Sequence, residues 1–107
     1  MTKLRIWWIP QIPMQSFITP VEDLVEAKLL LDTLASYDQF QLDNNVKPDY
    51  SNAGGLHIFD PDDNYDGPEG SWVDWHDSEG EDIDYYTLED LRKRKAAGNL
   101  PKWEGEA

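Results

Sequence analysis

The sequence predicts an α+β protein with one main amphipathic helix packed on a small, mostly antiparallel sheet, followed by a short C-terminal helix. Three observations carry this prediction. A β-branched and aromatic run at residues 3–9 is typical of a strand. A broad apolar stripe with helical spacing follows at residues 20–37. Two strand-like runs, at residues 56–59 and 71–76, flank a polar loop, which favours an antiparallel pair.

Length and composition favour a single cytoplasmic domain. A chain of 107 residues has the size of one domain, and we predict it over residues 1–98, with a flexible tail over residues 99–107. The absence of cysteine excludes disulfides and thiolate metal sites and fits a reducing compartment. No apolar run approaches the roughly 20 residues that span a bilayer, and no signal-peptide cleavage pattern follows the start.

The first strand has two possible positions in the sheet. Pro10 and Pro13 either end this strand or confine it to an edge. An exposed, Trp-rich edge would be a seam for dimerisation, so the expected state is a monomer or a homodimer. A second short strand is expected at residues 16–18.

The main helix is expected to begin at Thr19. This residue and Glu22 have the spacing of a capping box, and Pro20 suits the first helical position. The apolar stripe predicts that the helix ends near residue 37. Residues 40–42 alternate in polarity and predict a short strand, and residues 52–55, which include two glycines, predict a break.

A second helix is expected to begin at Thr87, with Asp90 in the capping-box position. Acidic residues in its first turn and the bases at residues 92–95 suit the helix dipole, and Gly98 suits the left-handed residue that follows a helix. Only two large apolar residues lie in this stretch, so the helix is expected to be mostly exposed. Trp103 is the residue expected to dock the tail.

The most informative stretch is residues 60–90. It carries thirteen of the twenty-two acidic residues and no Lys or Arg, so its charge equals the net charge of −13 of the whole chain. Such a run is typical of disorder, but its five Trp and Tyr residues indicate that part of it is anchored to a fold. The charge repels nucleic acid and anionic membranes and favours encounter with basic partners. The alternative is that the acidity serves solubility alone.

The strand at residues 71–76 adds aromatic side chains to this acidic stretch. Alternation puts Trp72 and Asp74 on one face and Val73 and Trp75 on the other. One tryptophan is therefore expected at the surface beside carboxylates, as in a hot spot for an Arg-rich protein. The alternative is a sheet covered on both faces, with both tryptophans in the core. The predicted partner-binding residues are Trp72, Asp74, Trp75, Asp77, Glu79, Glu81, Asp82 and Asp84.

The sequence contains two candidate metal sites, and neither is predicted to bind a metal. Residues 62–67 match the first half of a calcium loop, but Val73 stands where a bidentate Glu is needed. Calcium at this loop stays an alternative. His57 and His76 would approach each other if their strands pair, but no histidine spacing signature supports a metal site.

No enzyme motif is present. The sequence has no nucleophile elbow, Walker loop, dinucleotide fingerprint or cysteine nucleophile, so we predict no catalytic residues and no cofactor. A small phosphate ligand would require four bases to converge, namely Lys3, Arg5, Lys28 and Lys47.

A DNA mimic is the second binding hypothesis. B-form DNA carries one phosphate charge per about 1.7 Å of axis, and alternate residues of a strand lie about 6.6 Å apart. Glu79 and Glu81, and likewise Asp82 and Asp84, have this two-residue step. The bases at residues 92–95 interrupt the acidic field and weaken the analogy.

Four segments resemble a family of small bacteriophage proteins labelled superinfection exclusion proteins: WIPQIPM at 8–14, EAKLLLDTLA at 26–35, NNVKPDYSNAGGL at 44–56 and WVDW at 72–75. The resemblance covers about residues 4–86 and implies a phage accessory protein in the cytoplasm of the infected bacterium. The loop at residues 60–70 and the segment after Tyr86 are expected to be peculiar to this chain.

Together with the acidic stretch, this resemblance predicts a non-enzymatic protein that binds and modulates a basic host or competing-phage protein. The role is superinfection exclusion or anti-defence. Neither direct binding of nucleic acid nor membrane insertion is expected.

Overall fold

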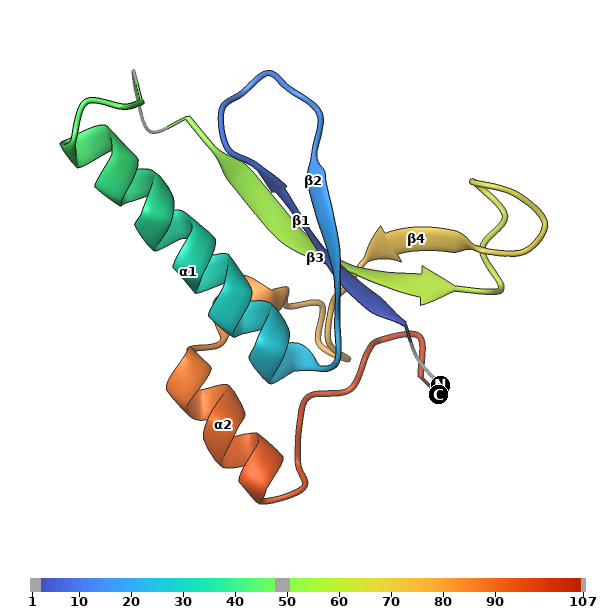
Figure 1. The fold of residues 1–107 in the computed structure, drawn as a ribbon. Helices are drawn as coiled ribbons and strands as arrows, with labels where there is room; N and C mark the ends of the chain where they lie inside the picture. The colour runs from blue at the N-terminus through green and yellow to red at the C-terminus, as the bar shows by residue number, and fades with distance from the viewer. Residues whose placement is uncertain (1–2, 48–50, 107) are drawn as a thin grey trace.

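Four strands and two α-helices organise the part of the chain that the computed structural model describes, residues 3–47 and 51–106 (Figure 1). The elements are β1 (Leu4–Ile9), β2 (Phe17–Val21), α1 (Leu24–Asp43), β3 (Ala53–Asp60), β4 (Ser71–Asp74), the short 3-10 helix η1 (Ile83–Tyr85) and α2 (Leu88–Ala96). The strands form one antiparallel sheet in the order β2-β1-β3-β4. The predicted α+β class and the pairing of β3 with β4 are confirmed.

The Trp-rich strand β1 lies in the middle of the sheet, between β2 and β3. Pro10 ends it, and the alternative position at an edge, with its dimer seam, is wrong. Alternation along β1 buries Ile6 and Trp8 toward the helices, whereas Arg5 and Trp7 lie on the opposite face. The apolar run at residues 6–9 is continuous because both faces of β1 are covered: Ile6 and Trp8 lie in the core, and Trp7 stacks with His57 on the other face.

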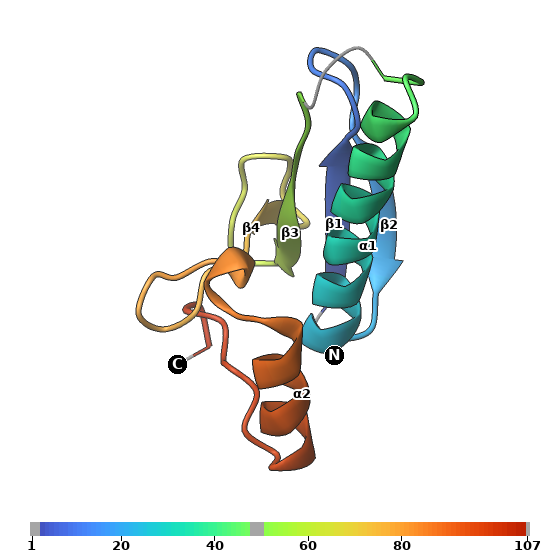
Figure 2. The same ribbon diagram turned by 90° about the vertical axis from the view of Figure 1, so that its left-hand side faces the viewer.

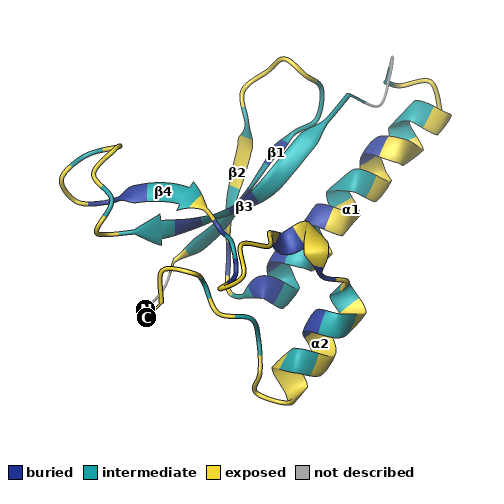
Figure 3. Cartoon of the chain, turned by 180° about the vertical axis from the view of Figure 1, so that it is seen from behind, coloured by how far each residue is buried: buried dark blue, intermediate teal, exposed yellow. Residues whose placement is uncertain are grey.

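The hydrophobic core lies between one face of the sheet and the helices. Helix α1 runs along this face, in front of β1 and β2 in Figure 2. Its buried side faces inward in Figure 3, and its C-terminal end is largely exposed. The buried apolar residues are Ile6, Trp8, Val21, Leu24, Ala27, Leu31, Leu56, Ile58, Trp75, Ile83, Tyr86 and Leu91.

Helix α1 begins four residues later than predicted. Asp23 is its N-cap, and its carboxylate accepts the backbone N–H of Glu26 at 2.9 Å, while the Glu26 carboxylate accepts the N–H of Glu22 at 2.9 Å. Thr19 and Pro20 belong to β2, whose pairing with β1 continues to the buried Val21. The capping pattern recurs at Asp23, and strand pairing decides which of the two copies is used.

The same helix ends later than predicted, at Asp43, so the expected strand at residues 40–42 is helical. A buried carboxylate accounts for the extension. Asp38 Oδ2 accepts the indole N–H of Trp8 at 3.0 Å and the amide of Asn52 at 2.9 Å, and it lies 3.2 Å from Lys47 Nζ. These contacts need the last two turns of α1 to stay helical, because only then does Asp38 face the sheet.

The predicted break at residues 52–55 is also wrong from Ala53 onward, where β3 begins. Gly54 and Gly55 are in the strand because the β1 tryptophans cover them. A Cβ on Gly54 would lie 2.2 Å from a ring carbon of Trp8, and one on Gly55 would lie 2.7 Å from Trp7 Nε1. The glycines therefore provide space for two rings rather than a turn.

The C-terminal helix follows the prediction closely. Thr87 caps α2 by accepting the N–H of Asp90 at 3.1 Å, and Gly98 has the left-handed φ of 69°. Leu91 is fully buried, so this mostly exposed helix is nevertheless anchored in the core. After it, Trp103 packs against the core and pairs with Asp77 in an isolated bridge. The division at residue 98 into a domain and a flexible tail stays a prediction.

None of the helices in the described ranges combines the length and the apolar character needed to span a bilayer.

Replacing Asp38 by Ala should lower the free energy of unfolding by about 3–5 kcal/mol, because it removes the carboxylate that Lys47 faces and leaves two buried donors without their acceptor. Urea unfolding followed by tryptophan fluorescence measures this loss. Asp43→Ala, at the exposed end of the same helix, is the matched control and should change stability by about 0.5 kcal/mol or less. Equal losses in both variants would contradict the role of Asp38.

Candidate functional site

The acidic stretch at residues 60–90 runs from the end of β3 through β4 and η1 into α2. Of the eight predicted partner-binding residues, the structure exposes five and brings them to the region around the end of β4 and η1. We call these five the acidic face: Asp74, Glu79, Glu81, Asp82 and Asp84. Trp75 and Asp77 are 3% and 5% exposed, so they lie inside the protein and support this face from below.

Asp77 organises the turn that carries the acidic face. Its Oδ1 accepts the backbone N–H groups of Glu79 and Glu81, both at 2.9 Å. Its Oδ2 accepts the hydroxyl of Tyr86 in a short hydrogen bond. The hydrogen bond from Tyr86, followed by those from the backbone amides, holds the pKa of the Asp77 carboxyl below its usual range. An ionised carboxylate inside the turn thus keeps Glu79 and Glu81 pointing outward.

Tyr86 is the partner that joins this turn to the core. Burial, reinforced by the neighbouring Asp77 carboxylate, raises the pKa of the Tyr86 hydroxyl to about 12. The phenol therefore remains a hydrogen-bond donor throughout the physiological range. Its ring also lies 5.4 Å from the guanidinium of Arg94, which connects the turn to α2.

The strand predicted at residues 71–76 ends at Asp74, but the alternation predicted for Trp72, Val73 and Trp75 is confirmed. Val73 and Trp75 pack on the core side, and Trp72 lies on the opposite face of the sheet. There the guanidinium of Arg5 stacks over Trp72 at 4.3 Å, and the Phe59 ring meets it edge-on at 5.4 Å. Trp72 is only partly exposed, because the protein's own arginine already occupies its ring.

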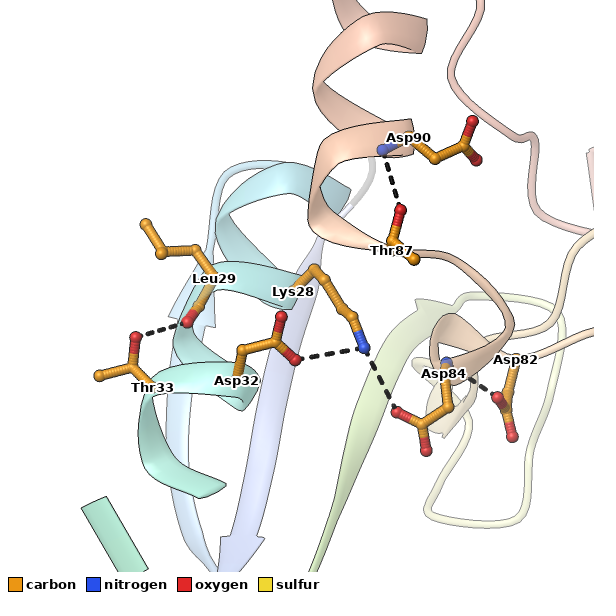
Figure 4. Close-up of polar contacts among 8 residues, drawn as sticks. All are labelled: Lys28, Leu29, Asp32, Thr33, Asp82, Asp84, Thr87 and Asp90. Atoms are coloured by element: carbon orange, nitrogen blue, oxygen red, sulfur yellow. Dashed lines mark hydrogen bonds and ion pairs between the residues drawn. The ribbon is translucent and has the colours of Figure 1, made fainter. Parts of the chain in front are cut away.

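Asp84 connects the acidic face to α1 (Figure 4). Lys28 Nζ lies 3.2 Å from Asp32 and 3.9 Å from Asp84. The backbone N–H of Asp84 donates to the Asp82 carboxylate at 2.9 Å, which caps η1. Lys28 thus bridges two elements that are distant in sequence.

The basic residues do not neutralise the rest of the face. On α2, Lys93 pairs with Glu89, Arg94 with Asp90, and Lys95 with Asp23. Within the described residues, no Lys or Arg lies within ion-pair distance of Glu79, Glu81 or Asp82.

The four bases that a phosphate ligand would need are held apart. Lys3 lies over the Phe59 ring and Arg5 over Trp72, on the outer face of the sheet. Lys28 faces α1 and η1, and Lys47 faces the buried Asp38. Lys3 and Arg5 thus lie over neighbouring rings, but Lys28 and Lys47 are engaged elsewhere, so the four bases do not converge and the condition for a phosphate site is not met.

The candidate metal residues also serve other contacts. In the calcium-like loop, Asp63 accepts the N–H of Tyr65, and Asp66 accepts that of Trp72. His57 lies 3.5 Å from Asp74, whereas His76 lies 3.7 Å from Glu104. Over residues 3–47 and 51–106, no three His, Cys, Asp or Glu side chains are grouped as metal ligands.

Two cavities adjoin the acidic face, and sequence reasoning missed both. One of about 140 Å³ is bordered by Trp7, Asp74 and Asp82, and one of about 220 Å³ by Trp8, Leu31 and Asp32. Gly54 and Asp84 border both. The glycine pair after Asn52 was the available signal, but in the sequence it is indistinguishable from a turn.

These features define a class: a small α+β protein whose four-stranded antiparallel sheet carries one long helix and an acidic face. Comparison with known proteins is consistent with this description. The model of the family "Superinfection exclusion gene product 17" matches residues 3–95. A superinfection exclusion protein of Salmonella phage P22 is 48% identical over 79 residues, which cover 69% of this chain and 77% of that relative. The chain therefore belongs to the superinfection exclusion gene product 17 family.

The predicted family resemblance is thus confirmed, and the match extends beyond Tyr86 into α2. The segment just after Tyr86 is therefore shared with the family and is not peculiar to this chain. No solved structure matches the chain significantly.

Replacing Asp77 by Asn should destabilise the protein near neutral pH. A carboxyl whose pKa is lowered by folding stabilises the native state above its unfolded pKa of about 3.9, and this stabilisation is lost as the pH falls through the folded pKa. The stability difference between wild type and variant should therefore be full at pH 7 and shrink below about pH 4. Melting temperatures at pH 7 and pH 3 provide the measurement.

Tyr86→Phe separates the two kinds of hydrogen bond to Asp77. It removes the hydroxyl but leaves the backbone amide bonds, so it should keep part of the acid dependence. A difference between wild type and Asp77→Asn that does not depend on pH would show that the carboxylate charge is unimportant in this turn.

Proposed function

We propose that this chain is a non-enzymatic phage accessory protein that takes part in superinfection exclusion by binding a basic host or competing-phage protein through its acidic face. The family match and the P22 relative support superinfection exclusion as the biological role. The exposed carboxylates of the acidic face indicate the mode of action. The bacterial cytoplasm is the proposed location.

The observation that carries the proposal is a set of outward-facing carboxylates on an ordered turn. Glu79, Glu81 and Asp82 are exposed, and within the described residues no base pairs with them. Trp75 and Asp77 are buried beneath this turn, and Asp77 accepts hydrogen bonds from its backbone. Because the backbone of this turn is already ordered, binding costs little backbone entropy, and the carboxylates attract a basic surface at long range.

Solubility alone is a weaker explanation of this arrangement. Charges that only keep a protein in solution can stand on any exposed position. Here a buried carboxylate, a buried tyrosine and two backbone amides are used to shape the turn that displays the acids. Because buried groups shape the turn that displays the acids, recognition of a partner explains the arrangement better than solubility does.

The geometry argues against DNA mimicry. The hypothesis relied on the extended spacing of alternate residues in a strand. Residues 79–84 instead form a turn and the start of η1, so no strand holds the steps from Glu79 to Glu81 and from Asp82 to Asp84 at phosphate-like intervals. A partner that binds DNA remains one outcome of the experiment below.

Reversing four charges on the face tests the proposal. The variant Asp74→Lys, Glu79→Lys, Glu81→Lys and Asp82→Lys leaves the buried Asp77 intact but removes the Asp82 cap of η1. A lost cap costs about 1 kcal/mol, so the variant should fold, and circular dichroism checks this first. The variant should slow association with the partner roughly 10-fold or more at low salt and abolish exclusion of a superinfecting phage. The measurements are plaque counts on expressing cells and an affinity pull-down at low and high salt with mass spectrometry.

The matched control makes the same change in charge elsewhere, with Asp43→Lys, Asp62→Lys, Glu69→Lys and Glu106→Lys, all at exposed positions. It should keep both the exclusion and the captured partner. Full exclusion by the folded face variant would refute the proposal. A captured partner that duplex DNA displaces would revive mimicry.

A further inference from the structure

Strand β3 is only half paired on one side. Its neighbour β4 pairs with residues 57–60, and Trp75 just after β4 bonds to Leu56, whereas residues 53–55 pair with β1 alone. Figure 1 shows β4 running beside only the second half of β3. The first half therefore has an open edge, and this edge lies beside the acidic face, since Gly54 and Asp84 border the same two cavities.

The backbone groups of Gly54 point out of this edge. The N–H of Phe59 donates to Lys3 at 3.0 Å, on the β1 side, and the N–H of Trp75 donates to the carbonyl of Leu56 at 3.0 Å, on the β4 side. Residues two apart in a strand direct their N–H and C=O groups to the same side. Gly54 therefore faces the side of Leu56, where no described residue hydrogen-bonds to it.

The edges of the sheet differ in how they are protected. On the outer strand β2, Pro20 pairs with Arg5 of β1. By the same alternation, the backbone N–H and C=O of Arg5 point toward β3, so the backbone groups of Pro20 point away from β1. The missing N–H of Pro20 is thus on the solvent side, and proline there discourages further pairing. The open half of β3 has neither a proline nor a charged residue to discourage pairing; it contains two glycines.

The two cavities border this edge and differ in how the carboxylates at their borders are paired. The 140 Å³ cavity has the carboxylates of Asp74, Asp82 and Asp84 at its border. Trp7 lines it too, and its buried indole N–H has no hydrogen-bond partner among the described residues, so a backbone carbonyl of a bound segment can accept from it. The 220 Å³ cavity is lined by Trp8, Leu31 and Ala35 beside Asn52, Asp32 and Asp84, and Lys28 already pairs with both of its aspartates.

We propose that an extended segment of the basic partner adds to the sheet as a strand at the open edge of β3. Its backbone pairs with Gly54, a Lys or Arg side chain enters the 140 Å³ cavity, and an apolar side chain enters the 220 Å³ cavity. Side chains that alternate along a strand fit two cavities that share Gly54. This inference rests on the proposed function and adds the mode of binding and the partner's pattern, basic alternating with apolar.

The test uses a defined probe, an acetylated and amidated octapeptide of alternating arginine and valine, added to the ¹⁵N-labelled full chain. Binding should shift the Gly54 amide signal and slow its hydrogen exchange at least several-fold. The same peptide methylated at every backbone nitrogen keeps the charges but cannot donate to a strand, and it should lose this protection. Equal effects of both peptides would overturn strand addition.

Two conservative variants test the basic subsite. Asp82→Asn removes a carboxylate at the 140 Å³ cavity, and Glu79→Gln removes one on the neighbouring turn outside it. The first should weaken peptide binding several-fold, and the second should leave the Kd nearly unchanged. Equal weakening by both variants would reduce the contact to general charge attraction and overturn the assigned subsite.

The outcomes separate this inference from the function it rests on. If the captured partner protects only residues 79–84 and not Gly54, strand addition fails while the acidic face stands. If no partner is captured and no exclusion occurs, the proposed function fails. Protection of Gly54 that rises with protein concentration alone would assign the edge to a second copy of the chain and overturn the basic partner.

Discussion

The buried carboxylate of Asp38 is the interaction on which the rest of the structure depends. It joins the second half of α1 to Trp8 in the central strand and to Asn52 just before β3. Lys47 reaches the same carboxylate and also donates to the carbonyl of Pro10. A buried charge is costly unless donors surround it, so this cluster specifies one relative position of the helix and the sheet.

That position also shapes the first half of β3. With Asp38 holding Trp8 in place, the Trp8 ring covers Gly54, and a side chain at this position would collide with it. The first half of β3 consequently lies close to α1 and carries no side chain at Gly54. The space next to it becomes the 220 Å³ cavity, bordered by both the helix and the strand. Fold stability and the candidate docking edge are thus linked through one tryptophan.

The carboxylates of the acidic stretch have two roles: some are buried and shape the fold, and others are exposed at the surface. Asp77 is surrounded by donors and shapes the turn, whereas Glu79 and Glu81 contribute their amides to it and expose their side chains. Asp82 caps η1, and Asp84 meets Lys28 on α1. Composition alone cannot reveal this division, because an aspartate that receives hydrogen bonds and one that faces water are the same letter in the sequence.

The sequence by itself determined the α+β class, the cap of α2 at Thr87, the antiparallel β3–β4 pair and the alternation of Trp72 and Trp75, because each depends on local chemistry or on a two-residue period. Only the tertiary structure decided where α1 begins and ends, whether Gly54 and Gly55 turn or extend, and which acids are buried. Each of these depends on a partner distant in the chain: β1 for Thr19, Trp8 for Asp38 and Gly54, and Tyr86 for Asp77. Local propensity yields to such contacts, since burial and strand pairing outweigh a single cap or turn preference.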